Sequence, residues 1–403
     1  MIRRVAVTGV GAISALGLNR DDFWNALIAG RNGFAPIAAH GCSGLKFTSG
    51  AEVRGFAAAN HIDPKIADTM DRFAHFAVMT AREAVADAGI VWTPELRDST
   101  VIATGSCIGG QTSQDQQFWE VYKLGKNRVH PFTIPRTMAN AGACQVSMDL
   151  GITGPSFTLS TACSSAAHAM GMAFQMVRGG QAELALAGGS EAPFSFGILK
   201  AWEAMRVVSQ DTCRPFSKNR TGMILGEGAA MLVLEPMEAA QARGAKIYAE
   251  MVGFGMSSDA HHLTQPSSEG AVRAMRMALR DAGIGPTEIG YINAHGTGTE
   301  ANDSTETKAI HSVFGERGAV IPVSSTKSMH GHALGAAAAM EAAATVLALH
   351  HGILPPTANF TEADPHCDLD VIRNHARELR VGYALSNSFA FGGMNAVLAF
   401  KAV

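Results

Sequence analysis

The stretch Ser156-Phe-Thr-Leu-Ser-Thr-Ala-Cys-Ser-Ser-Ala166 decides the fold of this chain. Its first five residues read as a short strand and its last residues open a helix of small side chains, so Cys163 lies at the turn between them. Residues 320–338 repeat this shape in the second half of the chain, with a strand-like run at Val320–Ser324. Alternating strands and helices predict an α/β fold, and the repeat predicts two similar halves.

Two further pairs of segments show the same internal duplication. A Gly-rich turn leads into an apolar strand at residues 226–234 and again at residues 392–400. The opening strand at residues 4–11 has a counterpart at residues 249–255. Because each pair has one member in either part of the chain, we expect two pseudo-equivalent halves, residues 1–248 and residues 249–403.

The composition is that of a globular protein with few charged residues. Of the 403 residues, 47% are hydrophobic and only 17% are charged, against about 25% charged residues in an average soluble domain. The 43 glycines follow no collagen-like period. These values exclude a disordered chain and predict that much of the surface is buried, either in a multilayer fold or in an oligomer.

The charge balance argues against nucleic acid and membranes as partners. The 32 Lys and Arg residues and 35 Asp and Glu residues leave a net charge of −3, without a basic cluster for phosphate groups. The N-terminus has no signal-peptide core, and the most apolar stretch, Ala333–Leu349, contains Glu341 and reads as a buried helix. The six cysteines are too far apart for a C-x-x-C motif. We expect a reduced, soluble, cytoplasmic protein with no integral membrane association.

Cys163 is the first candidate catalytic residue. A strand-to-helix turn offers unpaired N–H groups and the positive end of the helix dipole, and both lower the pKa of a thiol. The alternative is a buried core cysteine, which is the more common use of a lone cysteine. The run Thr161–Ser165, set between a strand and a small-residue helix, favours the nucleophile.

Two histidines on Gly-rich turns complete a three-point pattern with Cys163. His295 lies in Asn293-Ala-His-Gly-Thr-Gly-Thr299, after an apolar strand-like lead. His332 ends the run Lys327-Ser-Met-His-Gly-His. Such turns expose both the side chain and the backbone to a ligand. One cysteine and two histidines in this setting predict an active site.

Metal and nucleotide sites are the competing interpretations. The pairs His261-His262 and His350-His351, and the H-x-H run that ends at His332, have no Cys or carboxylate partners at zinc spacing. Gly9-Val-Gly11 starts a dinucleotide-binding fingerprint that fails at Ser14, and no phosphate-binding P-loop occurs. We therefore expect no metal and no nucleotide cofactor.

At these residues the sequence resembles the β-ketoacyl-acyl carrier protein synthases, the condensing enzymes of the thiolase-like superfamily. The resemblance runs essentially end to end, and within the family it is closest to the FabF type and its nodulation protein E branch. The family motifs are Thr161–Ser165, His295–Thr299, Lys327–His332 and Asn387–Gly393, and the branch-like segments are Leu199–Arg206, Asp211–Ser217 and Asp364–Val371.

The resemblance implies a thiolase-like, five-layered αβαβα fold from two pseudo-duplicated halves, and a dimer. We expect a homodimer, with a heterodimer with a chain-length factor as the alternative. No cofactor is expected, since the substrates would be carried on the phosphopantetheine arm of acyl carrier protein. The implied reaction is a decarboxylative Claisen condensation of an acyl chain with malonyl carrier protein, in the elongation of a specialised, unsaturated or polyene chain. Housekeeping fatty-acid elongation is the alternative.

The resemblance also implies a role for each motif residue. Cys163 would carry the acyl chain as a thioester, while His295 and His332 would donate hydrogen bonds to the enolate oxygen that decarboxylation creates. Lys327 would tune the histidines, with Glu341 as its buried acidic partner.

The resemblance implies two roles for Phe391. Its backbone N–H would form an oxyanion hole together with that of Cys163, and its side chain would be the aromatic gate before the acyl tunnel. The other implied substrate-binding residues are Thr297 and Thr299, which would hold the phosphopantetheine arm, Phe389, and Ile108, a tunnel-lining position. A basic patch for an acidic carrier protein is expected from four residues, Lys65, Lys123, Lys126 and Arg128.

The sequence departs from the family pattern at three positions. The gating loop reads Ala390-Phe-Gly-Gly-Met394-Asn, where Gly and Thr are usual, and His330 replaces a usual Thr. Because alanine adopts positive φ at a higher cost than glycine, Ala390 predicts a stiffer or differently posed gate. His330 adds an ionisable group two residues from His332, so the dependence of activity on pH is not expected to follow that of the family.

Three other functions match parts of this pattern. A non-catalytic chain-length partner would lack the nucleophile, and a degradative thiolase would carry a second cysteine where this chain has Phe391–Met394. A papain-like cysteine hydrolase would need neither Lys327 nor a second histidine. The combination of Cys163, His295 and His332 favours the elongating condensing enzyme.

Overall fold

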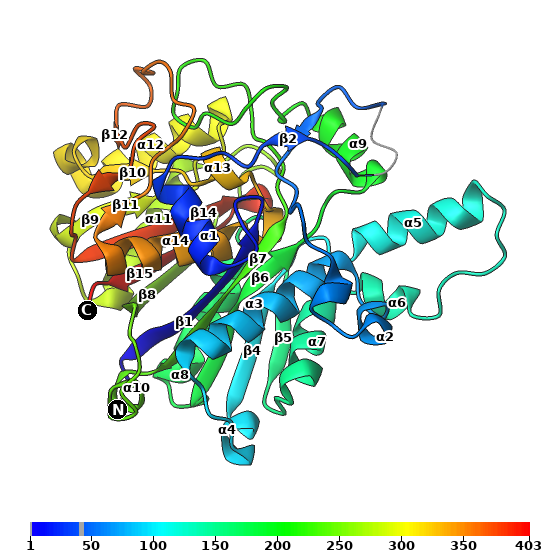
Figure 1. Cartoon of the computed structure of the whole chain (residues 1–403). Coiled ribbons are helices and arrows are strands. Elements are labelled where there is room, and N and C mark those ends of the chain that lie inside the picture. Colours follow the sequence, from blue (N-terminus) through cyan, green and yellow to red (C-terminus); the bar gives the residue numbers. More distant parts are fainter. Residues whose placement is uncertain (1, 40–43) are drawn as a thin grey trace.

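Eleven strands lie side by side in one sheet, within the residues that the computed structural model describes, 2–39 and 44–403. The strand order is β12-β10-β9-β14-β15-β8-β1-β7-β6-β4-β5 (Figure 1). The bounds of these strands are β1 (Val5–Ser14), β4 (Thr100–Gly105), β5 (Ser156–Leu159), β6 (Leu184–Glu191), β7 (Gly228–Pro236), β8 (Ala249–Ser258), β9 (Ile289–Asn293), β10 (Pro322–Ser324), β12 (Asp370–Val371), β14 (Tyr383–Ala390) and β15 (Met394–Lys401). Cys42 lies outside the described residues.

The sheet repeats one strand order on either side of its centre. From the centre outward, the first half reads β1-β7-β6-β4-β5 and the second half reads β8-β15-β14-β9-β10. In each half the first three strands pair antiparallel and the outer two join in parallel. The halves meet where β1 and β8 pair antiparallel, with Val5 opposite Met251. Two pseudo-duplicated halves are therefore confirmed, whereas the boundary after residue 248 remains a prediction.

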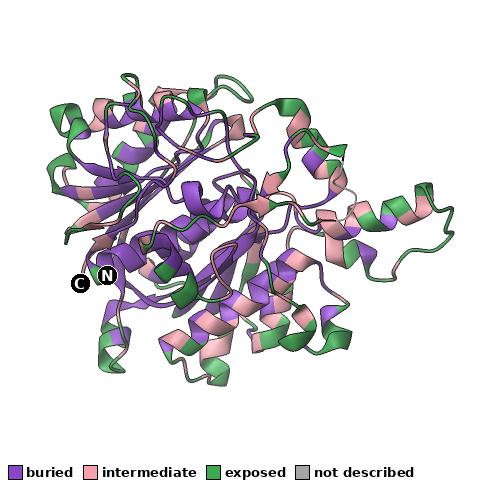
Figure 2. Cartoon of the chain, turned by 45° about the horizontal axis from the view of Figure 1, so that its top comes forward, coloured by how far each residue is buried: buried purple, intermediate pink, exposed green. Residues whose placement is uncertain are grey.

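Helices cover the outer faces of the two halves and fill the space between them. On the first half lie α3 (Arg72–Ala88) and α7 (Ala141–Leu150), and on the second α11 (Ser268–Ala282), against which α12 (Glu300–Phe314) packs. Two more helices, α8 (Ser165–Arg178) and α14 (Ala337–His351), each contact strands of both halves. They form a central layer, which completes the predicted five-layered αβαβα fold (Figures 1 and 2).

Small side chains let the central layer pack closely. Every residue from Ala337 to Leu349 in α14 is buried, and eight of these thirteen positions have the side chain of alanine or threonine. The prediction of a buried helix at residues 333–349 is confirmed. Within residues 2–39 and 44–403, no helix has the length and hydropathy needed to cross a membrane.

Glycines in the two central strands allow the outer helices to approach the sheet. A Cβ atom at Gly11 in β1 would lie 2.1 Å from the carbonyl oxygen of Thr80 in α3. The equivalent glycine in β8, Gly255, would meet the carbonyl oxygen of Ala274 in α11 at the same 2.1 Å. The G-x-G run at residues 9–11 is therefore a packing feature of the duplicated fold and not a fragment of a nucleotide-binding loop.

The shorter elements connect these layers. They include the helices α1 (Arg20–Ile28), α2 (Pro64–Ala67), α4 (Pro94–Asp98), α9 (Phe196–Met205), α10 (Met237–Ala242) and α13 (Lys327–His330). They also include the short 3-10 helices η2 (Ala58–Asn60), η3 (Pro286–Glu288), η4 (Gly315–Ala319), η5 (Leu334–Ala336) and η6 (Phe391–Gly393). Two small sheets pair β2 (Ala35–Pro36) with β3 (Ser49–Gly50) and β11 (Ile353–Leu354) with β13 (Arg377–Glu378).

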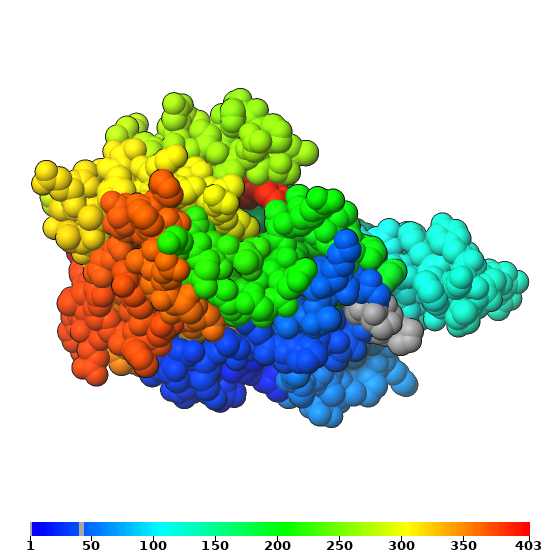
Figure 3. Space-filling model, turned by 90° about the horizontal axis from the view of Figure 1, so that it is seen from above, coloured from blue at the N-terminus to red at the C-terminus, as the bar shows by residue number. Residues whose placement is uncertain are grey.

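One segment projects from the body of the molecule. It contains α5 (Gln111–Tyr122), α6 (Thr133–Thr137) and the loop between them, and we call it the arm (Figures 1 and 3). The arm exposes large apolar side chains, namely Phe118, Trp119, Tyr122, Leu124, Val129, Phe132 and Ile134. An apolar surface of this kind marks an interaction site.

Replacing Gly11 with alanine is expected to destabilise the protein. The new methyl group would meet backbone atoms of α3 that cannot move away singly, so we expect Gly11→Ala to lower the free energy of unfolding by about 1–3 kcal/mol. Urea titrations followed by circular dichroism measure the change. Gly382→Ala is the control, because a Cβ atom there meets no atom within 4 Å. Equal midpoints for the two variants would contradict the packing argument.

Candidate active site

Cys163 lies between β5 and α8, at the strand-to-helix turn predicted from the sequence. The preceding residue, Ala162, has a φ of +53°, a left-handed conformation that is costly for a residue with a side chain. Ser165 holds the turn closed, since its hydroxyl donates to the carbonyl of Ala162 at 2.6 Å and accepts the N–H of Thr161 at 2.9 Å. The thiol is thereby fixed on a tight turn and is 8% exposed.

His295 follows β9 on a loop that a buried carboxylate holds in place. The N–H groups of His295 and Gly296 donate to the two oxygens of Glu306, at 2.9 Å and 2.8 Å. The side chain of Asn387 in β14 donates to the same carboxylate at 3.1 Å. Glu306 and Asn387 were not singled out as a pair from the sequence, because they are distant in the chain and belong to no shared spacing motif.

His332 follows α13 and has a defined hydrogen-bonding state. Its Nδ1 atom accepts the backbone N–H of Leu334 at 3.1 Å, and the backbone N–H of His332 donates to the carbonyl of Ile224 at 2.7 Å. Since Nδ1 is an acceptor, the ring hydrogen of the neutral imidazole lies on Nε2.

Lys327 lies in the interior beside His295, with no exposed surface. Its ammonium group lies 3.2 Å from Nδ1 of His295, donates to the His295 carbonyl at 2.6 Å, and forms an ion pair with Glu341 from α14. Because an ammonium group only donates, Nδ1 of His295 is an acceptor and Nε2 carries the ring hydrogen. Both histidines therefore present an Nε2–H donor.

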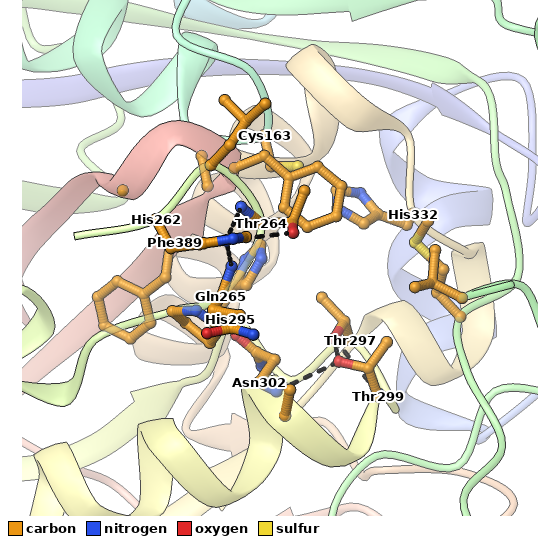
Figure 4. A pocket seen from close by; sticks show the side chains of 18 of the residues that line it. Cys163, His262, Thr264, Gln265, His295, Thr297, Thr299, Asn302, His332 and Phe389 are labelled. Carbon is orange, nitrogen blue, oxygen red and sulfur yellow. Dashed lines mark hydrogen bonds between the residues drawn. The ribbon is translucent and has the colours of Figure 1, made fainter. Parts of the chain in front are cut away.

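The structure brings the three predicted side chains together from distant parts of the chain (Figure 4). The sulfur of Cys163 and one ring nitrogen each of His295 and His332 lie within 4.8 Å of one another. The two imidazoles meet edge to face, with centroids 5.6 Å apart and planes at 85°. One cysteine sulfur and two imidazole donors thus surround a single point.

Burial and the Lys327 charge keep the histidines neutral. Burial, followed by the charge of Lys327, lowers the pKa of both His295 and His332 well below the ordinary histidine value of 6.5. The same two causes lower the pKa of His330 to about 3, and its ring nitrogens contact the Gly331 carbonyl and the Thr326 hydroxyl at 2.8 Å and 3.0 Å. His330 therefore adds no ionisation near neutral pH.

The predicted lowering of the Cys163 pKa is wrong. Burial raises the pKa of the thiol to about 11, and this outweighs three groups that lower it, the charge of Lys327 and the N–H groups of Phe391 and Cys163 itself. The sequence indicated that Cys163 lies at the start of a helix, but it did not indicate how deeply the thiol is buried. The two N–H groups face the sulfur, as the implied oxyanion hole requires.

The same three side chains have the spacing of a metal site. Cys163, His295 and His332 could together offer sulfur and nitrogen ligands to one ion. The Lys327 ammonium group contacts the ring of His295, however, and its positive charge opposes a second cation at that point. The arrangement suits a site that stabilises negative charge.

A cavity opens onto these groups. Thr297, Thr299, Phe389 and Phe391 line it, as the sequence predicts for substrate-binding residues. The hydroxyls of Thr297 and Thr299 lie 2.9 Å apart (Figure 4). Other residues that line the cavity were not predicted to do so, although Trp202 lies in the branch-like segment Leu199–Arg206 and His262 in the His261-His262 pair: Trp202, Val207, Met223, His262, Leu263, Thr264, Gln265 and Pro266.

Phe391, the predicted gate residue, is in contact with Trp202. Its ring stacks on Trp202, with centroids 6.1 Å apart and an interplanar angle of 25°. Ala390 is extended, with φ of −110°, whereas Gly392 has a φ of +78°. Figure 3 shows the C-terminal segment in red at the floor of a hollow between the green and yellow segments.

Ile108 and the predicted basic residues are not among the residues that line the cavity. Ile108 packs with Cys107, Trp202 and Leu334 in a hydrophobic cluster and is absent from the residues that line the cavity, so its tunnel role remains a prediction. The predicted basic residues are exposed, with Lys65 on α2 and Lys123, Lys126 and Arg128 on the arm. A hydrogen bond of 3.0 Å between Nε2 of His130 and the Asp68 carboxylate joins the end of α2 to the arm.

Comparisons with known proteins agree with this geometry. The family models for the β-ketoacyl synthase N-terminal and C-terminal domains match residues 2–240 and 248–361. Nodulation protein E of Rhizobium sp. is 48% identical over 405 residues and 100% of both chains. The 3-oxoacyl-[acyl-carrier-protein] synthase 2 of Synechocystis sp. is 44% identical over 407 residues, 99% of this chain and 98% of the relative.

A solved structure, the ishigamide ketosynthase/chain length factor, superimposes over 100% of both chains with a TM-score of 0.95 at 37% identity. Fold, site and relatives point to one conclusion: the chain belongs to the β-ketoacyl synthase family of condensing acyltransferases.

Proposed function

We propose that this β-ketoacyl synthase elongates a carrier-bound acyl chain by two carbons, with Cys163 as the nucleophile. The observation that carries the proposal is the meeting of the Cys163 sulfur with two neutral histidines at one cavity. A sulfur that accepts the acyl group and two N–H donors for an enolate are the groups that a decarboxylative condensation needs.

The first half-reaction transfers the acyl group to Cys163. The sulfur attacks the thioester carbonyl of the acyl carrier protein, and the thiol proton leaves with the released carrier thiol. The tetrahedral intermediate bears an oxyanion that the N–H groups of Cys163 and Phe391 stabilise, since both face the sulfur.

The second half-reaction joins two more carbons to the chain. Malonyl carrier protein loses carbon dioxide, and the electron pair of the broken bond gives an enolate whose oxygen accepts Nε2–H bonds from His295 and His332. The enolate carbon attacks the acyl thioester, and Cys163 leaves as a thiolate that takes a proton from solvent. Contacts at Nδ1 of both rings support this assignment, because they keep the hydrogen on Nε2.

Lys327 and Glu341 support the histidines without touching the substrate. The charge of Lys327 disfavours protonation of both imidazoles, and Glu341 compensates that charge in the interior. We assign the phosphopantetheine arm to Thr297 and Thr299, whose hydroxyls line the cavity together with Phe389.

The relatives support a specialised acyl chain, and the exposed arm supports a dimer. Nodulation protein E of Rhizobium sp. is 48% identical and the synthase 2 of Synechocystis sp. is 44% identical, so we propose elongation of a specialised chain, with housekeeping elongation as the alternative. The apolar arm supports a dimer, which we propose to be a homodimer, although a solved neighbour is a ketosynthase with a chain length factor. The basic residues on α2 and the arm suit an acidic carrier protein.

Intact-protein mass spectrometry tests the function directly. Mixing the protein with acyl carrier proteins of several chain lengths is expected to add one acyl group to wild type and none to Cys163→Ala. A chase with malonyl carrier protein should discharge the adduct as a β-ketoacyl product. Cys144→Ala is the control for unspecific acylation, because Cys144 is an exposed thiol. An absence of adduct with every chain would favour an accessory subunit.

The rate of condensation is not expected to change with the protonation of a histidine near neutral pH. A histidine with the ordinary pKa of about 6.5 is roughly 90% protonated at pH 5.5. Burial and Lys327 lower the pKa of His295 and His332, so both should stay neutral donors there. Single-turnover condensation by acylated enzyme should change by less than about twofold between pH 7.5 and pH 5.5. A rate that falls with an apparent pKa near 6.5 would contradict neutral imidazoles.

Gate flexibility is expected to depend on Ala390. Glycine at this position would widen the backbone conformations open to the Phe391 loop, so Ala390→Gly should raise acylation rates about 2–5-fold, most for long chains. Stopped-flow acylation with carrier proteins of graded chain length gives the rates. Ala390→Ser keeps the Cβ atom and serves as the control. Equal rates for Ala390→Gly and wild type at every chain length would exclude this role.

A further inference from the structure

A buried carboxylate that the proposed reaction does not use lies beside the active site. Glu191 ends β6 and has no exposed surface. It accepts hydrogen bonds from the Ser106 hydroxyl at 2.8 Å, the Cys107 N–H at 2.7 Å, the Ile108 N–H at 3.3 Å and the Gly335 N–H at 3.0 Å. These partners come from two segments that are more than two hundred residues apart in the sequence.

The two segments touch each other across the carboxylate. A Cβ atom at Gly335 would lie 2.5 Å from the Cys107 nitrogen and 2.5 Å from Oε2 of Glu191. Only a glycine at this position lets the turn after β4 and the turn after His332 share one acceptor. The carboxylate thus links the Ser106–Ile108 turn to the catalytic histidine turn.

The link reaches His332 through one residue. Leu334 donates its N–H to Nδ1 of His332, and it does so in a left-handed conformation, with φ of +48°. The next N–H along the chain, that of Gly335, is the one that Glu191 accepts. A strained non-glycine residue keeps such a conformation only when its surroundings hold it, and the Gly335–Glu191 bond is one of those restraints.

The other end of the link reaches the side chain predicted to line the acyl tunnel. Ile108 and Leu334 pack in the same hydrophobic cluster, which also contains Trp202. A shift of the Ser106–Ile108 turn therefore acts on the Leu334 turn in two ways, through this cluster and through the shared carboxylate.

We propose that Glu191 is a positioning residue that aligns His332 for decarboxylation and couples it to the turn carrying Ile108. The inference rests on the proposed function, in which His332 donates to the enolate. It assigns Glu191 to the condensation half-reaction and not to acylation, because Cys163 and its two N–H groups receive no contact from this carboxylate. All of its neighbours are donors, so the charged form satisfies them best, although burial raises the pKa of Glu191.

The test separates the two half-reactions in Glu191→Gln. The amide nitrogen cannot accept a hydrogen bond, so in either orientation of the amide at least one of the N–H groups of the two turns would lose its acceptor. We expect acylation of Cys163 to stay within about threefold of wild type. Decarboxylation of malonyl carrier protein should fall about 10–100-fold, less than the roughly 100–1,000-fold for complete loss of one oxyanion donor, because His332 stays in place but is misaligned.

A spectroscopic readout distinguishes positioning from general destabilisation. Nitrogen-15 NMR of histidine-labelled protein, assigned with His332→Asn, should show the His332 hydrogen on Nε2 in wild type and a mixture of tautomers in Glu191→Gln. Gly335→Ala is the second variant, because its methyl group pushes Glu191 aside while leaving the carboxylate in the chain. Gly335→Ala should likewise keep the acylation rate and lower the decarboxylation rate. Glu235→Gln is the control, since it alters a buried carboxylate near the end of β7, whereas Glu191 pairs with Gly228 at the start of that strand.

Two outcomes would overturn the inference. Acylation and decarboxylation that fall together in proportion to melting temperature would make Glu191 a purely structural residue. Wild-type decarboxylation and an unchanged His332 spectrum in both variants would show that it has no role at this histidine. A wild-type protein that forms no adduct and decarboxylates nothing would refute the proposed function instead, and the NMR comparison would still decide whether Glu191 positions His332.

Discussion

The buried ammonium group of Lys327 is the constraint on which the site depends. An unpaired charge in a protein interior costs several kcal/mol, so a lysine with no exposed surface must be surrounded by acceptors. Glu341 supplies the opposite charge from the central helix α14, and His295 supplies a ring nitrogen and a carbonyl. Because Lys327 donates to Nδ1 of His295, the tautomer of that ring is fixed, and the Lys327 charge adds to burial, the larger cause, in lowering the pKa values of His295 and His332. The donor direction of His295 and part of the neutrality of both rings therefore depend on this one cation.

The duplicated fold explains why this cation lies close to Cys163. In the first half the turn after β5 carries Cys163, and in the second half the equivalent turn after β10 carries Lys327. The loops after the equivalent strands β4 and β9 also match. Glu191 holds the N–H groups of the first loop, and Glu306 holds those of the second, which bears His295. The carboxyl ends of parallel strands meet at one edge, so the duplicated framework supplies four anchored turns to one site.

The sequence predicted the parts of this site that are encoded locally. Cys163 on its strand-to-helix turn, the duplication and the buried helix with Glu341 each follow from composition and pattern within a few residues. The partnership of Glu191 with Gly335 could not be predicted, because the two are 144 positions apart and meet only through the tertiary fold. The stacking of Trp202 on Phe391 has the same origin. Whether His330 ionises near neutral pH could not be predicted either, because this depends on its burial in the folded chain.

The thiol of Cys163 shows most clearly what local reasoning omits. A helix N-terminus and a nearby cation both stabilise a thiolate, yet burial dominates and raises the pKa to about 11. At neutral pH the resting thiol is therefore almost entirely protonated, and a protonated thiol is a poor nucleophile and a poor target for oxidants. The donors that only partly offset burial in the free enzyme, the N–H groups of Cys163 and Phe391, are those assigned to the oxyanion of the bound thioester. Reactivity then arises when a carrier-bound substrate supplies the carbonyl oxygen for which these donors are placed, so the same burial that suppresses the resting thiol restricts its chemistry to that substrate.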